Sequence, residues 1–186
     1  RAVTAAFNVS NSLHTWLARY DGGAGGDDSA KAVASDVFGN VYVATRVWNG
    51  EDTDIVVRKY SAAGEFLWSA AIDGAGASQD YPTDIAVDSE GNAVVAGKAW
   101  NGANFDWYIA KLAAFDGDLL WDAKLNGPGS SDDTPTAVAV DSQNNVVVAG
   151  QLWNDFNLDW HVVKYAGTGG GLLWDETING NGSSED

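Results

Sequence analysis

The chain has 186 residues, of which 45% are apolar, and it is long enough to bury a sizeable core. Its formal net charge of −16 argues against nucleic acid as a partner, because phosphate binding needs a basic surface. The absence of cysteine excludes disulfides and thiolate metal sites, and no apolar run approaches the roughly 18 residues that predict a membrane span.

A repeat with a spacing of 52 to 53 residues runs through the chain. A period of about 50 residues built from short strands predicts an all-β fold, a β-propeller in which each repeat supplies one four-stranded blade. The aligned columns are Trp16, Trp68, Trp121 and Trp174; Asp36, Asp88 and Asp141; Trp48, Trp100 and Trp153; Asp54, Asp106 and Asp159; and Lys59, Lys111 and Lys164.

In chain order, the repeat predicts one propeller segment over residues 1–186. Residues 1–28 are a half blade, with its third and fourth strands at Ala2–Asn8 and Leu13–Tyr20. Full blades follow at 29–80, 81–133 and 134–179, and residues 180–186 begin the loop to a next blade. Because closed rings usually need four blades, we expect a piece of a longer propeller, an oligomer that completes the ring, or an open arc. We favour the excised piece, since the pattern is cut at both ends and the chain begins at Arg1 without any methionine.

The second full repeat shows the strands of one blade most clearly. Its four apolar segments have the length and residue types of strands, and turns rich in Gly, Asn and Asp join them. The predicted strands are Thr83–Asp88, Ala93–Trp100, Asp106–Ala113 and Leu119–Leu125.

The turn between the first two strands repeats with an aspartate at its start. Asp36, Asp88 and Asp141 are expected to shape these turns. A residue with positive φ is needed three residues later, where the chain has Gly39, Gly91 and Asn144. Asn tolerates this conformation best after Gly, so the exception supports the assignment.

The segment Asp80–Gly97 (DYPTDIAVDSEGNAVVAG), followed by Asp106–Leu112 (DWYIAKL), resembles the bacterial β-propeller repeat family called SBBP. Repeats of that family carry an Ala-Val-Asp-x-x-Gly-Asn turn and then an Asp-aromatic-x-Ala-Lys-Leu strand. The similarity extends to Lys31–Tyr60 and Asp133–Tyr165. It implies an extracellular or cell-surface module of bacterial or archaeal type, usually without assigned chemistry.

The fourth strand resembles a second type of repeat, that of the quinoprotein propellers. There a Gly-x-x-x-Trp string follows a turn, as in Gly64–Trp68 and Gly117–Trp121. The resemblance implies that Trp68, Trp121 and Trp174 dock between neighbouring blades. Nothing else in the chain indicates a quinone cofactor.

One face of the predicted propeller collects the loops between strands two and three and the loops between blades. Tryptophan beside asparagine suits carbohydrate, with the ring on a sugar face and the amide bonding hydroxyls. Packing between blades is the competing interpretation for these tryptophans. The pairs are Trp48 and Asn49, Trp100 and Asn101, and Trp153 and Asn154.

The loops between blades carry acids that suit calcium, the one candidate cofactor. Asp28, Asp80 and Asp133 are the candidate ligands, because calcium prefers carboxylate and amide oxygens. They could instead accept backbone amides in their own loops. Asp54, Asp106 and Asp159 each begin a strand, where a carboxylate is expected to be structural.

Catalytic residues are scarce. The two histidines, His14 and His161, fall at unrelated repeat positions, and no serine lies in a nucleophile elbow. The first hypothesis is therefore a non-enzymatic module for protein or matrix contacts or self-assembly. The second is a lectin-like propeller that binds glycan or calcium. The third is a fragment of a propeller hydrolase with paired carboxylates.

Overall fold

The computed structural model describes residues 16–73 and 78–178, and its strands form three antiparallel four-stranded sheets. The all-β propeller-type prediction is confirmed, and the described residues contain no helix that could cross a membrane. Blade 1 consists of β1 (Ser29–Ser35), β2 (Val41–Trp48), β3 (Thr53–Tyr60) and β4 (Phe66–Ile72). Blade 2 consists of β5 (Tyr81–Val87), β6 (Ala93–Trp100), β7 (Phe105–Leu112) and β8 (Leu119–Leu125). Blade 3 consists of β9 (Thr134–Val140), β10 (Val146–Trp153), β11 (Leu158–Tyr165) and β12 (Leu172–Ile178).

The strand limits follow the sequence pattern closely. In blade 2, β6 and β8 have the predicted bounds, and β7 begins and ends one residue earlier than predicted. The largest difference is β5, which starts at Tyr81 because pairing with β6 continues past a register shift near Pro82. Short turns between consecutive strands therefore determine the sheet order, as in a meander.

The turns between first and second strands have the expected backbone conformation. Gly39, Gly91 and Asn144 have φ values of 81°, 82° and 63°. Each turn is also held by the aspartate at its start. In blade 1, the carboxylate of Asp36 accepts the backbone N–H of Phe38 at 2.9 Å. Asp88 and Asp141 accept the corresponding backbone bonds in the other two blades.

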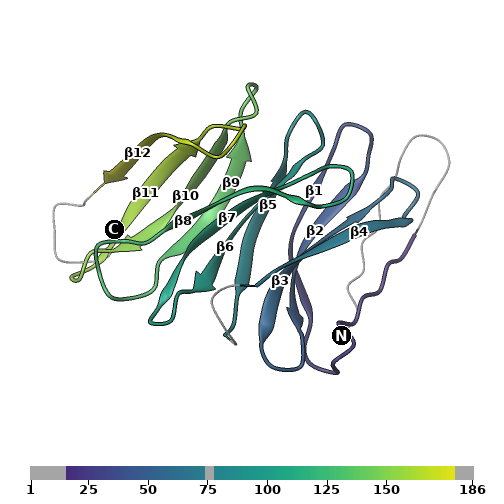
Figure 1. Ribbon diagram of the computed structural model, residues 1–186, viewed down its shortest axis with the longest axis horizontal. Coiled ribbons are helices and arrows are strands. Elements are labelled where there is room, and N and C mark those ends of the chain that lie inside the picture. Colours follow the sequence, from purple (N-terminus) through teal and green to yellow (C-terminus); the bar gives the residue numbers. More distant parts are fainter. Residues whose placement is uncertain (1–15, 74–77, 179–186) are drawn as a thin grey trace.

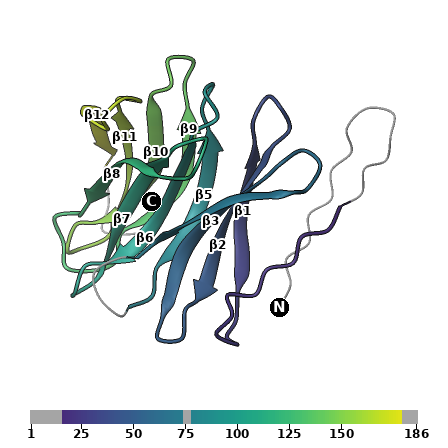
Figure 2. The ribbon, with the colours of Figure 1, turned by 45° about the vertical axis from the view of Figure 1, so that its right-hand side comes forward.

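The three blades lie side by side in chain order, with the N-terminal and C-terminal blades at opposite ends of the array (Figure 1). Figure 2 shows the same order from a second direction. The first strands β1, β5 and β9 are neighbours, so each sheet extends outward from its first strand to its fourth. The sheets do not close into a ring, which is the geometry of a partial propeller.

The hydrophobic core lies between blades rather than within one. We call the side of a sheet that points to the following blade its forward face. The forward face of blade 1 packs on blade 2, and that of blade 2 packs on blade 3. Strands such as β6 are buried on both sides, which explains their nearly continuous apolar sequence. In the third and fourth strands, the buried apolar residues of the forward face are Ile55, Val57, Trp68 and Ile72 in blade 1 and Trp107, Ile109 and Trp121 in blade 2.

The fourth-strand tryptophans of blades 1 and 2 cross to the next blade. Trp68 donates its indole N–H to the carbonyl oxygen of Ala114 at 3.1 Å, and Trp121 donates to Gly167 at the same distance. Each ring also covers a glycine in the turn that precedes the fourth strand of the next blade. A Cβ atom at Gly117 would lie 2.7 Å from the ring of Trp68, and one at Gly170 would lie 2.7 Å from that of Trp121. Glycine is required there for the ring to approach.

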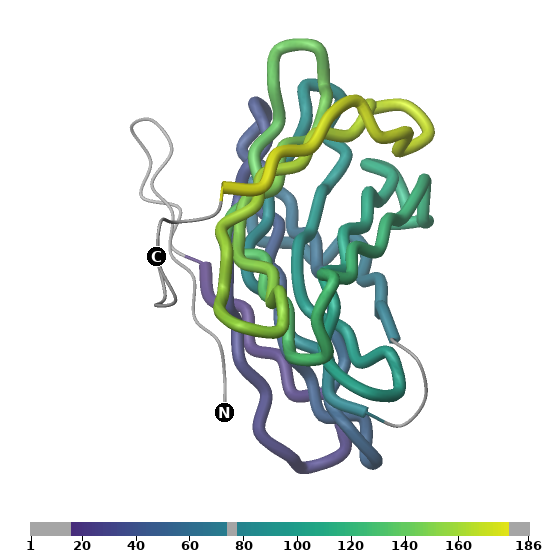
Figure 3. The backbone as a smooth tube through the Cα atoms, turned by 90° about the vertical axis from the view of Figure 1, so that its left-hand side faces the viewer, coloured from purple at the N-terminus to yellow at the C-terminus, as the bar shows by residue number. Residues whose placement is uncertain are grey.

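Trp174 differs from the prediction that all three tryptophans pack between blades. Its side chain is 47% exposed, and every residue of β12 is exposed. The reason is geometric, because no described blade follows blade 3. Figure 3 shows blade 3 from the side that a following blade would cover.

The N-terminal segment covers the opposite end of the array. Trp16 and Ala18 pack against Val41, Val43 and Tyr60 of blade 1, and a Cβ atom at Gly64 would lie 2.4 Å from the ring of Trp16. Residues 16–20 thus occupy the place of a preceding fourth strand, although they carry no strand assignment. The predicted strand Ala2–Asn8 and the first part of Leu13–Tyr20 lie outside the described residues.

Candidate functional site

The loops between second and third strands share one internal hydrogen-bond pattern. The side-chain oxygen of Asn49 accepts the backbone N–H groups of Glu51 and Asp52 at 2.8 and 3.0 Å. Its amide nitrogen donates to the carboxylates of Asp52 and Asp54. Asn101 and Asn154 make the corresponding bonds in their own loops. The amides expected to bond a glycan are therefore used to shape the loops, and their role toward a ligand stays a prediction.

The strand-initiating aspartates belong to the same pattern. Asp54, Asp106 and Asp159 accept the amide of the loop asparagine at 3.0, 2.8 and 2.6 Å. This amide joins the start of the third strand to the end of the second in every blade. The carboxylate is thus a structural acceptor at each repeat.

The predicted calcium column, Asp28, Asp80 and Asp133, has one carboxylate at the entry to each blade. Asp28 accepts the backbone N–H of Gly22 at 2.6 Å and that of Trp48 at 2.9 Å. Asp133 makes the matching bonds in blade 3, at 2.6 and 2.7 Å. Asp80 accepts the N–H of Trp100 at 3.1 Å. The three side chains are buried, and each tethers the incoming loop to the end of a second strand.

Burial has an electrostatic effect on this column. It raises the pKa of Asp133, although the two backbone N–H groups partly offset the effect. The three carboxylates belong to three different blades and are not among the described acids that converge on one point. Calcium binding by this column stays a prediction.

A groove of about 520 Å³ lies between blades 1 and 2, on the face that carries these loops. Both kinds of loop contribute to it, as predicted for one propeller face. Tryptophans from neighbouring blades line the same space, and two further aromatic residues join them. The lining residues are Trp48, Glu51, Asp52, Ser78, Gln79, Tyr81, Trp100 and Phe105.

Three of the four aromatic rings that line the groove are in contact with one another through Phe105. The ring of Phe105 lies 5.2 Å from that of Trp100 and 5.5 Å from that of Tyr81, both edge to face. Two cations cover these rings. Arg46 lies 4.7 Å from the centroid of Tyr81, and Lys98 lies 4.6 Å from that of Phe105. The cluster therefore carries positive charge in an otherwise acidic chain.

The groove departs from the repeat. One repeat further on, Thr134 stands in the position of Tyr81 and Leu158 in that of Phe105. Trp153, the third tryptophan of the column, does not line the groove. Sequence reasoning identified Trp48 and Trp100 but missed the two rings that set this groove apart. The signal that could have identified them is the change of residue type at these two positions, within columns that are otherwise regular.

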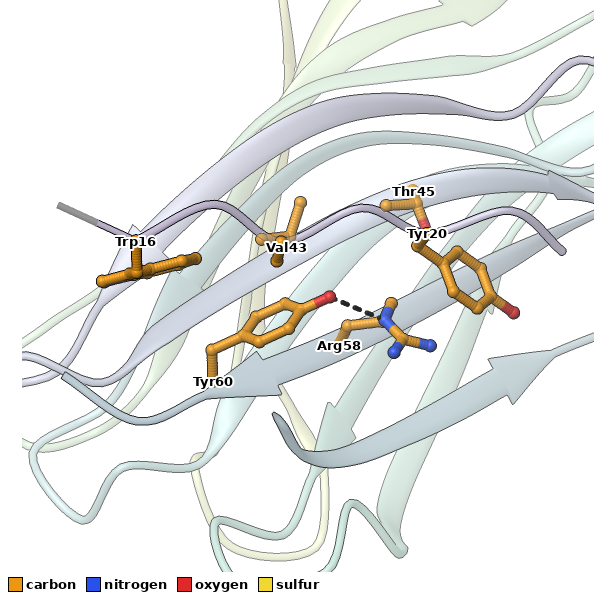
Figure 4. Close-up of a pocket in the computed structure, with 7 residues that line it drawn as sticks. Trp16, Tyr20, Val43, Thr45, Arg58 and Tyr60 are labelled. Carbon is orange, nitrogen blue, oxygen red and sulfur yellow. Dashed lines mark hydrogen bonds between the residues drawn. The ribbon is translucent and has the colours of Figure 1, made fainter. Parts of the chain in front are cut away.

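A second hollow lies between the N-terminal segment and blade 1, with a volume of only about 20 Å³ (Figure 4). Trp16 and Tyr60 flank it, and Arg58 donates to the hydroxyl of Tyr60 at 2.9 Å. The guanidinium of Arg58 also lies 3.8 Å from the ring centroid of Tyr20. A space of this size holds about one water molecule, so it is a packing interface rather than a ligand site.

The lysine column pairs with the turn aspartates on the opposite face. Lys111 lies 2.8 Å from Asp88, and Lys164 lies 2.7 Å from Asp141. Burial alone would raise the pKa of Asp88, but its bonds from Lys111 and Asn92 outweigh burial and lower it. Lys59 instead donates to the carbonyl oxygen of Ala114, in the next blade. These pairs support turns and blade contacts.

His161 is the one histidine in the described part of the chain, since His14 lies outside it. Its Nδ1 lies 2.7 Å from the hydroxyl of Thr177, and its Nε2 lies 3.8 Å from Asp175. Burial lowers the pKa of the imidazole, and the charge of Asp175 partly opposes this effect. The ring also contacts Trp107 of blade 2 edge to face, which is the environment of a packing residue.

Comparisons with known proteins agree with the fold. Residues 74–106 match the SBBP family, described as a beta-propeller repeat. A comparison with curated proteins found no match. Several solved structures share the architecture.

BamB from Moraxella catarrhalis superposes with a TM-score of 0.50 at 16% identity, over 83% of this chain and 40% of BamB. Quinohemoprotein alcohol dehydrogenase from Comamonas testosteroni gives 0.53 at 18% identity, over 80% of this chain and 21% of the dehydrogenase. Endo-arabinase from Bacteroides thetaiotaomicron gives 0.50 at 17% identity, over 89% of this chain and 66% of the arabinase. At these identities the likeness shows the fold alone. The chain is thus a β-propeller segment with an SBBP-type repeat at residues 74–106.

Proposed function

We propose that the chain is a non-enzymatic protein-interaction module, and that its binding surface is the forward face of blade 3. The surface is made by Trp160, Trp174 and Ile178, which are 43%, 47% and 41% exposed. Exposed apolar side chains gathered on one sheet face are typical of interaction sites.

The repeat supports one kind of occupant, a further blade of the same type. The same three columns are buried in blade 1 as Ile55, Trp68 and Ile72, where blade 2 covers them. The surface of blade 3 thus continues an interface that the chain already forms twice. We propose that a further blade of this repeat, supplied by a second copy of the chain, covers it. Such head-to-tail contacts produce rings or filaments.

Light scattering after size exclusion tests this proposal. We expect an assembly of two or more 19.5 kDa chains that Trp174→Ser dissociates. Phe115→Ser is the matched control, because Phe115 is more exposed than Trp174 and lies in a turn outside these columns. A monomer at high concentration, or an assembly that resists Trp174→Ser, would reject a second copy as the occupant.

Glycan recognition is a second candidate function, supported by the aromatic groove between blades 1 and 2. Trp48 and Trp100 line a space in which Gln79 and Asp52 supply polar groups, the combination that sugars require. Titration with a glycan panel should change tryptophan fluorescence, and Trp100→Phe should weaken the response. Trp153→Phe, in the same column but outside the groove, should leave it unchanged. A flat response to the whole panel would exclude this candidate.

The location of the module is also a proposal. The SBBP-type repeat at residues 74–106 supports an extracellular or cell-surface location, since such repeats are expected there. Cell fractionation with a tagged chain would test it, and recovery in the cytoplasm would contradict it.

A further inference from the structure

Three carboxylates converge at one end of blade 1. Asp52 directly precedes β3, Asp54 is the second residue of that strand, and Asp73 directly follows β4. Because the two strands are antiparallel, with Ile55 opposite Ile72, the start of one meets the end of the other. Each aspartate offers one oxygen, and these oxygens all lie within 4.8 Å of one another.

Asp54 is one of the two buried members of this cluster, with an exposure of 9% beside 6% for Asp52. Its Oδ2 accepts the amide of Asn49, but its buried Oδ1 accepts no hydrogen bond from any described residue. A buried oxygen without a partner is costly, and native proteins rarely leave one. Burial raises the pKa of Asp54, the bond from Asn49 lowers it, and the charges of Asp52 and Asp73 raise it further. The position therefore lacks a positive partner.

Blade 2 provides an internal reference for this cluster. There Asn104 stands in the position of Asp52, and Asn126 in that of Asp73. Asp106 is retained, and its Oδ1 is also without a hydrogen bond among the described residues. Blade 2 thus has the same buried oxygen with one carboxylate instead of three. The excess negative charge is particular to blade 1.

We propose that Asp52, Asp54 and Asp73 form a calcium site. Calcium takes hard oxygen ligands in flexible geometry, and Asp73 is exposed, so that water can complete the coordination shell. Three carboxylates and an open side indicate a weak site, with a dissociation constant of about 10⁻⁴ to 10⁻³ M. A net charge of −16 favours the approach of cations. The proposal is independent of the blade 3 surface and concerns residues outside the Asp28 column.

Calorimetric titration of the full chain with calcium chloride tests the site. We expect one ion per chain, and binding weakened about tenfold or more in Asp73→Asn and in Asp52→Asn. These variants should fold, because they reproduce the asparagines that blade 2 already has at these positions. Asp118→Asn removes one charge at an exposed turn and should bind calcium like the unmodified chain. Equal binding by Asp73→Asn, or no binding by the unmodified chain at millimolar calcium, would overturn the proposal.

A gain of binding makes the test stricter. The double variant Asn104→Asp with Asn126→Asp gives blade 2 the three carboxylates of blade 1, so its stoichiometry should rise from one ion to two. A folded double variant that still binds one ion would contradict the carboxylates as the cause. Titration with magnesium checks the metal, because magnesium demands stricter octahedral geometry. Binding of magnesium without calcium would reject the assignment.

Discussion

Blades 2 and 3 contain nearly the same forward-face residues in very different surroundings. Trp107 and Trp121 of blade 2 are buried, whereas their counterparts Trp160 and Trp174 in blade 3 are 43% and 47% exposed. The difference does not come from hydropathy, because tryptophan stands at all four positions. It comes from the presence of a following blade. In this fold, burial is a property of the neighbouring repeat, as in other arrays in which each unit contacts only its neighbours.

The ion pairs at the turns between first and second strands show the same contrast. Lys111 and Asp88 in blade 2 have side-chain exposures of 4% and 0%. The matching pair in blade 3, Lys164 and Asp141, is 22% and 27% exposed. Lys111 also donates to the carbonyl oxygen of Gly167 in blade 3 at 2.9 Å. The following blade therefore closes the pair in blade 2 off from water.

The largest effect is expected from deleting the buried tryptophan. Trp121→Ala should lower the free energy of unfolding by about 3–5 kcal/mol, because it leaves a cavity between blades 2 and 3. Trp174→Ala should cost less than about 1 kcal/mol in dilute samples, where no second copy covers the ring. Denaturant unfolding of both variants measures the difference. Equal losses of unfolding free energy in the two variants would show that Trp174 is buried in solution, which would contradict the difference between blades 2 and 3.

The next effect is expected at the ion pairs. Asp88→Asn should destabilise the fold by about 3 kcal/mol, because it leaves the buried ammonium of Lys111 without its partner. Asp141→Asn should destabilise much less, and high salt should reduce the loss further, since that pair is exposed to solvent. Thermal unfolding of both variants at low and high salt measures this. A larger loss from Asp141→Asn would contradict the difference in burial.

The pH dependence of Asp88 follows from the direction of its pKa shift. The folded pKa lies below the ordinary value of 3.8, so the stability that Asp88 contributes is fully present above about pH 4. It is lost as the pH falls through the folded pKa. Asp88→Asn should therefore flatten the acid limb of the stability curve. An unchanged acid limb would exclude Asp88 as a source of acid unfolding.

Much of the fold could be predicted from the sequence because it repeats. Regular columns located the strands of blade 2 within two residues, and Asn144 adopts the positive φ that its position required. The repeat could not give the exposure of Trp174, because the residue matches Trp68 in every local respect. Only the absence of a following blade among the described residues separates them.

The candidate sites were harder to predict because they depend on departures from the repeat. Phe105 and Tyr81 form the groove by replacing the smaller or aliphatic residues of the other repeats. Aligning the repeats emphasises the residues that they share, so these two replacements were overlooked. Asp73 joins Asp54 through the pairing of β3 with β4, so their distance in sequence hid their proximity. Asn49 was expected to face a ligand, but it can satisfy the backbone of its own loop at shorter range.

A smaller effect is expected where Trp121 covers a glycine. Gly169 and Gly170 have φ values of 74° and 65°, so an alanine is strained at either position. A Cβ atom at Gly170 would lie 2.7 Å from the ring of Trp121, whereas one at Gly169 would have no neighbour within 4 Å. Gly170→Ala should therefore cost about 2 kcal/mol more than Gly169→Ala, through overpacking. Denaturant unfolding compares the two, and equal costs would show that the ring does not rest on Gly170.

The smallest expected effect concerns one column on the faces that point to the preceding blade, Tyr108 in blade 2 and His161 in blade 3. Burial lowers the folded pKa of His161 below its ordinary 6.5, although Asp175 at 3.8 Å partly opposes the shift. The stability that neutral His161 contributes is therefore present above about pH 6.5 and is lost as the pH falls through the folded pKa. His161→Tyr, which copies blade 2, should remove a decline in melting temperature between neutral and mildly acidic pH. If the melting temperature of His161→Tyr still declines over this pH range, the decline comes from groups other than this imidazole.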